Sequence, residues 1–254
     1  ASLFSPELFS DSMRDAVADL PVEERRTFVR KVFSFVDHDP RLKAMSGHVP
    51  LHRALERIIG APPVLFQDMA LSKPPFIGSE KPWHQDNAYF DWLPLELVGT
   101  AWIALDDATV ENGCMHVLPG GHKLGALKHY HTIDCEILPD RFDRERAVPI
   151  ELKAGGAMFF SAMLPHQTPP NGSAGRRRAL QFQYRGESTY EVNKEEFEKS
   201  DAKVIVSNHV SLLDHTAFQS FNKACSLSTR MLAQNLLYKI FFSMLGGELV
   251  QLDE

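Results

Sequence analysis

The sequence lacks the cysteines needed for a disulfide framework. Cys114, Cys135 and Cys225 are odd in number and widely spaced, which favours a reducing compartment. Long hydrophobic runs are also lacking. The longest run near the C-terminal end, LLYKIFFSML, is interrupted by Lys239 and is too short to span a bilayer. We therefore expect no contact with a membrane.

A strongly basic surface is lacking as well. The formal net charge is −6, and the basic run is RRR at 176–178, which is too short to form a patch for nucleic acid or anionic lipid. The first residues, ASLFSPELFSDSMRDA, lack the basic segment and apolar core of a secretory signal, so we expect a cytoplasmic location. The NGS at 171–173 fits a glycosylation acceptor, but without such a signal Asn-Gly indicates a turn.

Two kinds of local pattern divide the chain. Residues 6–60 carry apolar residues at helical spacing, and the segment VPLHRALERIIG predicts a helix that closes on Gly60. Residues 62–188 hold short runs that are rich in β-branched and aromatic residues and bounded by Gly or Pro. These runs are PVLFQDMAL, VGTAWIALDDAT, AVPIEL, GGAMFFSAML and RALQFQYR. The helical pattern returns in NKEEFEKS and over 228–245.

We predict a single domain over residues 1–254 that is mainly β with flanking helices. Its core, residues 62–188, is a double-stranded β-helix, the cupin-like jelly roll. Residues 1–60 and 189–254 are the helical parts, and we expect helices to pack on one sheet of the core.

The segment KPWHQDNAYF places His84 and Asp86 two positions apart. On a strand, residues i and i+2 point to the same face, so the imidazole and the carboxylate would form a chelating pair. Such a pair is weak evidence alone, because solvated strands carry the same residues. His166 follows an apolar strand and a Leu-Pro step. Two histidines and one carboxylate make the facial triad of non-haem Fe(II) oxygenases, which leaves positions open for substrate and O₂.

Arg177 follows His166 by eleven positions. In a strand over 177–185 it shares a face with Ala179, Gln181 and Gln183. The opposite, largely apolar face is formed by Arg178, Leu180, Phe182 and Tyr184, and we expect helices to cover it. A buried guanidinium needs a carboxylate partner, and no acidic residue falls on its face. A dicarboxylate co-substrate would supply one.

Over residues 62–188 the sequence resembles the phytanoyl-CoA dioxygenase-like branch of the Fe(II)/2-oxoglutarate oxygenases. The resemblance rests on KPP before WHQDNAYF, on TAWIALDDATVENGCMHVLPGGHK, and on PHQT followed by RRALQFQY. It implies that His84, Asp86 and His166 bind Fe(II), that Arg177 pairs with the distal carboxylate of 2-oxoglutarate, and that O₂ is consumed. Positions that contact the co-substrate in relatives are matched by Thr168, Trp102 and Gln67.

The resemblance implies hydroxylation of a small organic substrate with release of succinate and CO₂. Related halogenases have a small residue at the position of Asp86, so the carboxylate favours hydroxylation over chlorination. The substrate is not identified, and candidate cavity neighbours are Asn87, Tyr89, Trp92 and His122. The opening strand usual in the family is not found, and PGGHK replaces the commoner Pro-Gly-Ser-His.

Two other functions stay open. A cupin-type metalloenzyme of different chemistry would use HYH at 129–131, a second i, i+2 histidine pair, although its loop-like neighbours favour a solvated pair. A non-catalytic relative that binds a small acid would usually have lost a metal ligand or the arginine, and this chain keeps all four. The expected partner is a small molecule, with no nucleic acid.

Overall fold

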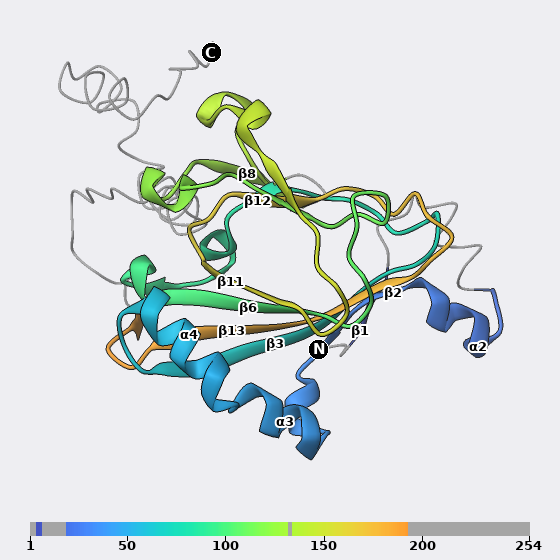
Figure 1. Cartoon of the computed structure of the whole chain (residues 1–254), viewed down its shortest axis with the longest axis horizontal. Coiled ribbons are helices and arrows are strands. Elements are labelled where there is room, and N and C mark those ends of the chain that lie inside the picture. The colour runs from blue at the N-terminus through green and yellow to red at the C-terminus, as the bar shows by residue number, and fades with distance from the viewer. Residues whose placement is uncertain (1–3, 7–18, 132–133, 193–254) are drawn as a thin grey trace, which may run out of the picture. The chain divides into compact units, whose positions relative to one another are not determined.

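The computed structural model describes residues 4–6, 19–131 and 134–192. Two β-sheets form its core, and helices lie against the larger one (Figure 1). In spatial order, the larger sheet contains β1 (Phe4–Pro6), β2 (Val29–Phe33), β3 (Pro63–Lys73), β13 (Arg177–Gly186), β6 (Val98–Ala104) and β11 (Ala157–Ser161). The smaller sheet contains β10 (Val148–Ile150), β7 (Met115–Val117), β12 (His166–Thr168) and β4 (Lys81–His84).

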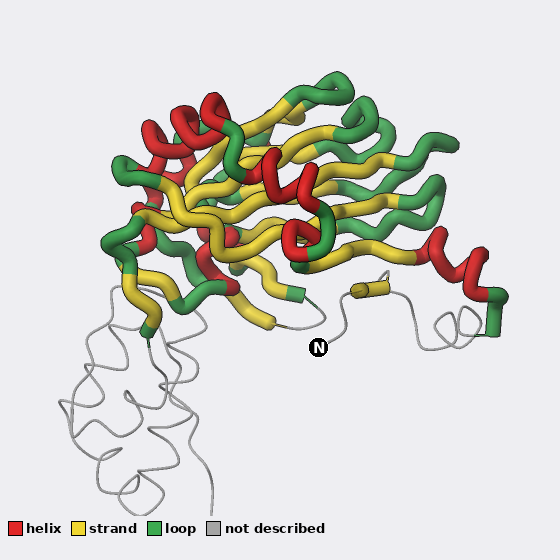
Figure 2. Tube along the Cα trace, turned by 90° about the horizontal axis from the view of Figure 1, so that it is seen from below, coloured by secondary structure: helices red, strands yellow, loops and turns green. Residues whose placement is uncertain are grey.

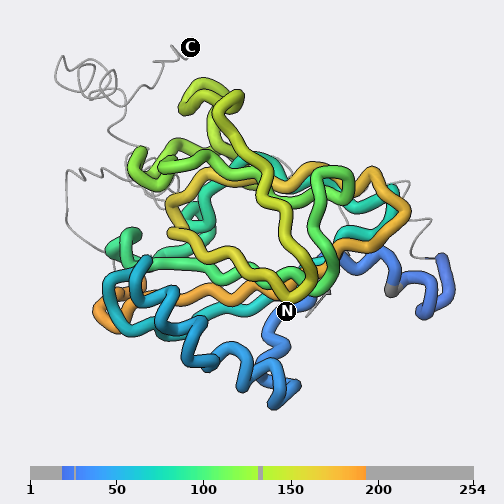
Figure 3. Tube along the Cα trace, in the orientation of Figure 1, coloured from blue at the N-terminus to red at the C-terminus, as the bar shows by residue number. Residues whose placement is uncertain are grey.

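The chain passes repeatedly between the two sheets. β3 and β4 lie in different sheets, as do β6 and β7, and the last crossings run from β10 through β11 and β12 to β13. Figure 3 shows these crossings between the two layers. All strand pairs within the two sheets are antiparallel. This connectivity is that of a jelly roll, so the predicted fold class is confirmed.

Shorter elements complete the described part. Two small pairs are β5 (Trp92–Leu93) with β14 (Tyr190–Glu191), and β8 (His129–His131) with β9 (Cys135–Ile137). The α-helices are α2 (Val22–Arg25), α3 (Pro40–Ser46) and α4 (Val49–Ile59). The 3₁₀ turns are η1 (Arg26–Phe28), η2 (Phe35–Asp37), η3 (Asp86–Tyr89), η4 (Leu95–Leu97), η5 (Gly121–Leu124), η6 (Pro139–Arg141) and η7 (Arg144–Arg146). No helix in the described ranges is long and apolar enough to cross a membrane.

Helix α4 covers the outer face of the larger sheet, and Figure 2 shows helical segments against its strands. Leu51, Leu55 and Ile59 recur at helical spacing and are buried in one cluster with Phe182 and other residues of β13. Burying each such side chain stabilises the fold by about 1.5–3 kcal/mol. The helix ends at Gly60, whose φ of 77° suits glycine, as the sequence predicted.

The predicted helical character of residues 6–60 is wrong at 29–33, which form β2. The apolar residues Val29, Val32 and Phe33 fit helical spacing, but the same segment pairs antiparallel with β3 at its open edge. Tertiary pairing therefore overrides the local pattern, and β1 and β2 extend the larger sheet beyond β3, where the sequence predicted helix. The helices predicted at NKEEFEKS and over 228–245 lie outside the described residues.

The loop between β12 and β13 is fixed by buried polar groups. Asn171 is 1% exposed, and its amide donates to Lys73 O, Pro74 O and Gly175 O at 3.0, 3.1 and 2.8 Å. The NGS segment is therefore structural rather than an accessible acceptor. Gly113 packs on the same loop, since a Cβ atom there would lie 2.3 Å from a main-chain oxygen of Pro169.

Candidate metal centre and co-substrate cavity

His84 and His166 are brought together by pairing in the smaller sheet. His84 is the last residue of β4, His166 is the first of β12, and the two are direct partners in the antiparallel register. Their ring centroids lie 4.1 Å apart. Asp86 is not on the strand as expected but begins η3. Because Gln85 keeps an extended backbone, the side chains of residues 84 and 86 still point the same way.

The three side chains converge on one buried point. Asp86 Oδ1 lies 3.5 Å from His84 Nε2 and 3.6 Å from His166 Nε2. The potential ligand atoms all lie within 4.8 Å of one another, and the three residues are 3–4% exposed. Within the described part of the chain, no other group of histidine, cysteine and carboxylate side chains meets this condition.

Hydrogen bonds to the remaining polar atoms orient these ligands. Nδ1 of His84 bonds Pro82 O at 2.8 Å, and Nδ1 of His166 bonds Leu164 O at 2.9 Å. A carbonyl can only accept, so Nδ1 carries the proton and the Nε2 lone pair faces Asp86. The Thr100 hydroxyl donates to Asp86 Oδ2 at 2.7 Å, which leaves Oδ1 for the centre. Two imidazole nitrogens and one carboxylate oxygen thus fit a divalent first-row metal.

The electrostatics favour the protonation states that bind metal. Burial lowers the pKa of His84 to about 3, and His166 and Lys81 act in the same direction. Burial alone would raise the pKa of Asp86, but His166, His84 and the hydrogen bond from Thr100 hold it below its usual range. A neutral His84 imidazole and an ionised carboxylate are the forms that ligate a metal.

Arg177 lines the same cavity, which has a volume of about 490 Å³. The residue is 2% exposed, and its Cζ lies 5.4 Å from the centroid of the Trp102 ring. Gln181 and Gln183 also line the cavity, as the predicted alternation of β13 requires. The neighbouring Arg178 points to the other face of the sheet, where it forms an ion pair with Asp106.

A family model described as phytanoyl-CoA dioxygenase (PhyH) matches residues 8–179. The chain belongs to the phytanoyl-CoA dioxygenase family. The matched residues include His84, Asp86, His166 and Arg177, and the match ends within β13.

Curated relatives and a solved structure agree with this family. The phytanoyl-CoA dioxygenase of Arabidopsis thaliana is 37% identical over 121 residues, which are 46% of this chain and 42% of the relative. The phytanoyl-CoA dioxygenase domain-containing protein 1 of Rattus norvegicus is 31% identical over 154 residues, 57% of this chain and 53% of the relative. The chain therefore spans about half the length of these relatives. EvdO2 from Micromonospora carbonacea var. aurantiaca, solved with 2-oxoglutarate, is 28% identical with a TM-score of 0.54, covering 75% of this chain and 79% of that chain.

The other residues assigned by resemblance to this dioxygenase family also line the cavity. Thr168 on β12 and Trp102 on β6 are 8% and 1% exposed, and Gln67 on β3 is half-buried. Gln67 lies directly opposite Gln183 in the register of β3 and β13. Their contact with a co-substrate stays a prediction.

The four candidate cavity neighbours behave differently from one another. Tyr89 and Trp92 line the cavity. Asn87 is 2% exposed but is not among the lining residues. His122 is exposed in η5, away from the cavity lining, so its assignment as a cavity neighbour is wrong. The sequence could not show which way His122 points, because a Gly-rich loop has no periodicity from which the direction of a side chain can be predicted.

His129, of the HYH pair, has a role that the cupin alternative did not foresee. Its Nε2 accepts a hydrogen bond from the Gln85 main-chain N–H at 3.0 Å, and its Nδ1 bonds Leu127 O at 2.8 Å. Both ring nitrogens are therefore occupied, and no lone pair is left for a metal. The geometry does not support a metal site at HYH.

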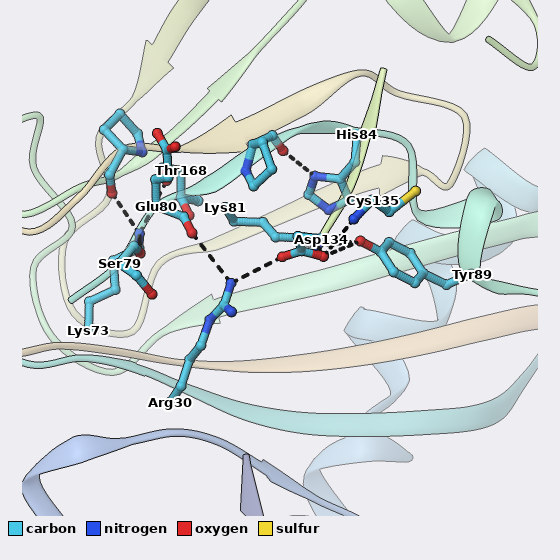
Figure 4. Close-up of polar contacts among 12 residues, drawn as sticks. Arg30, Lys73, Ser79, Glu80, Lys81, His84, Tyr89, Asp134, Cys135 and Thr168 are labelled. Carbon is cyan, nitrogen blue, oxygen red and sulfur yellow. Dashed lines mark hydrogen bonds and ion pairs between the residues drawn. The ribbon is translucent and has the colours of Figure 1, made fainter. Parts of the chain in front are cut away.

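Several polar residues near the site were missed by the sequence reasoning. They include Arg30, Lys31, Lys81, Asp134 and Glu191. Arg30 and Lys31 come from β2, the strand that was predicted as helix, and both line the cavity. Asp134 lies beside Arg30, Lys81 and Tyr89 (Figure 4). The β-branched and aromatic residues of VRKVF were the signal that could have indicated a strand, although the adjacent Arg30 and Lys31 interrupt any alternation.

Proposed function

We propose that this protein is a non-haem Fe(II)/2-oxoglutarate-dependent dioxygenase that hydroxylates a small organic substrate and releases succinate and CO₂. The observation that carries the proposal is the convergence of His84 Nε2, Asp86 Oδ1 and His166 Nε2 in a cavity that also contains Arg177. The family match and the EvdO2 structure with 2-oxoglutarate support it. The cytoplasmic location and the single-domain organisation also remain predictions.

In this proposal the three converging side chains would hold Fe(II), and Arg177 would hold the distal carboxylate of 2-oxoglutarate. Fe(II), when bound with 2-oxoglutarate and O₂, supplies the oxidising power that replaces a substrate C–H bond with C–OH. Three protein ligands leave other coordination positions for the co-substrates. The half-buried Lys31 lines the same cavity and adds a second positive charge for the diacid.

Aromatic side chains form another wall of the cavity. Phe66 contacts Phe90 edge-on, with ring centroids 4.9 Å apart, and lies 5.9 Å from the ring of Trp92. These rings are suited to contact the apolar part of a substrate and to keep water from the reacting carbon. Excluding water protects the oxidising centre from unproductive turnover.

An anaerobic titration tests the proposal. The full chain is mixed with Fe(II) and 2-oxoglutarate, and the visible charge-transfer band of the complex is recorded before O₂ is admitted. We expect the band to form and succinate to appear. The absence of both would overturn the proposal.

The neighbouring arginines of β13 provide a matched pair of variants. Arg177→Gln removes a buried guanidinium from the cavity, so the affinity for 2-oxoglutarate should fall at least about tenfold, as expected for loss of a charge-assisted bidentate pair. Arg178→Gln removes a guanidinium that bonds Asp106 on the opposite face and should leave the affinity unchanged. Equal effects of the two substitutions would contradict the role of Arg177.

A further inference from the structure

Four side chains from separate elements meet next to His84 (Figure 4). Arg30 Nη2 lies 3.5 Å from Asp134 Oδ2, and Lys81 Nζ forms an ion pair with Asp134 Oδ1. The Tyr89 hydroxyl donates to the same oxygen at 2.9 Å, and its ring centroid is 5.9 Å from that of His84. We call these four residues the Arg30–Lys81 cluster. All of them except Asp134 line the cavity that contains the metal centre.

The charges of the Arg30–Lys81 cluster do not balance. Two cations share one carboxylate, and Tyr89 is neutral because burial and Asp134 raise its pKa. The side chains of Arg30, Lys81 and Asp134 are only 10%, 14% and 18% exposed. One net positive charge is therefore held in a largely shielded place, which is unfavourable until an opposite charge arrives. In keeping with this, burial lowers the pKa of Lys81 even though Asp134 opposes the shift.

The other acidic residues of the cavity do not supply this charge. Asp86 faces the two histidines, and Glu191 lies in β14, paired with Trp92. Among the described residues, no carboxylate besides Asp134 forms an ion pair with Arg30 or Lys81.

We infer that the Arg30–Lys81 cluster binds an oxyanion, a carboxylate or a phosphate, carried by the primary substrate. The substrate class is therefore an organic acid. This inference deepens the proposed function and rests on it. Lys81 and His84 lie on the same short strand, so the bound acid group would fix the substrate next to the metal centre.

A panel of matched compounds tests the inference. The full chain is loaded anaerobically with Fe(II) and saturating 2-oxoglutarate and titrated calorimetrically. The ligands are inorganic phosphate, alkyl phosphates, and carboxylic acids of increasing chain length, each acid with its primary amide. We expect at least one carboxylic acid to bind about tenfold more tightly than its amide, or at least one alkyl phosphate to bind about tenfold more tightly than the amide of the same chain length, a difference of about 1.4 kcal/mol. The absorption band of the 2-oxoglutarate complex is followed throughout, so that displacement of the co-substrate is detected.

Substitutions of Lys81 and Asp134, which carry opposite charges, distinguish a binding site from a cluster with a purely structural role. Lys81→Met should abolish the preference for the acid over the amide, and Lys81→Arg should retain it. Asp134→Asn removes the one negative charge and should strengthen acid binding severalfold. The exposed Lys43 of α3 provides the control Lys43→Met, which should change nothing. Thermal unfolding of each variant shows whether it is folded.

Each outcome decides the question. No preference for any acid or phosphate in the panel overturns the inference, as does a preference that survives in folded Lys81→Met. Weaker acid binding in folded Asp134→Asn means that the cluster is a clamp between strands and not a binding site. If the absorption band never forms, the proposed function fails. If the band forms without any acid preference, only the present inference fails.

Discussion

The two sheets of the core hold their strands in place in different ways. In the larger sheet, β13 runs for 10 residues and pairs on both sides, and helix α4 covers its outer face. Strands of the smaller sheet are three or four residues long, yet they carry His84 and His166. The larger sheet thus gains stability from long ladders and apolar burial. The smaller one depends on individual side-chain hydrogen bonds.

Gln85 shows how such bonds compensate for short strands. It is fully buried between two proposed metal ligands, and its amide nitrogen donates to Gly125 O and Met163 O at 2.8 and 2.6 Å. Its side-chain oxygen accepts from Leu127 N at 2.7 Å. One side chain therefore ties two segments, the loop at 125–127 and the turn at Met163, to the centre. Substitutions in the two sheets should consequently separate metal binding from folding.

The largest effect is expected from Asp86→Asn, which removes the proposed anionic ligand but keeps the shape of the side chain. The affinity for Fe(II), measured by competition with a chelator, should fall by more than the roughly 10- to 100-fold typical of losing a residue that orients a ligand. Asp140→Asn, at an exposed site in η6, is the control. Retained iron affinity in Asp86→Asn would remove Asp86 from the ligand set.

Phe182→Ala tests the larger sheet. Phe182 is fully buried on its outer face, where its ring meets Phe35 edge-on at 5.6 Å. The free energy of unfolding in denaturant should fall by about 3–5 kcal/mol, because the truncation leaves a cavity. Iron affinity of the folded fraction should change little. A selective loss of iron affinity without loss of stability would show that the two sheets are not separable.

The same contrast explains what the sequence could and could not predict. The alternation in β13 correctly placed Arg177 towards the cavity and Phe182 under the helices, because a strand buried on both sides has a strict period of two. The meeting of His84, Asp86 and His166 was also expected. The turn at Asp86, the strand at 29–33 and the approach of Asp134 to Lys81 were not, because each depends on contacts between distant segments.

Thr100→Val tests a link between the two sheets. Thr100 lies on β6 of the larger sheet, and its hydroxyl bonds Asp86 Oδ2. Valine has a similar shape but no donor, so the carboxylate loses its orientation and iron affinity should fall about 10-fold, at the lower end for such residues. Thr109→Val, on a loop that does not line the cavity, is the matched control. An unchanged iron affinity would show that Asp86 is held in place without this bond.

The smallest effect is a pH dependence that involves β2, the second strand of the larger sheet. Burial, together with Lys81 and Arg30, lowers the pKa of Lys31 to about 8, although Asp134 and Asp86 oppose the shift. The Lys31 ammonium is therefore lost as pH rises through about 8, and 2-oxoglutarate affinity should fall by about three- to tenfold over that interval. In the ligand-free protein the unfolded state keeps this proton up to the ordinary lysine pKa, so the free energy of unfolding should rise with pH between the two values. Lys31→Met should remove both dependences and Lys43→Met neither. A 2-oxoglutarate titration that shows the same pH profile in Lys31→Met as in the unchanged chain would exclude Lys31 from the co-substrate site.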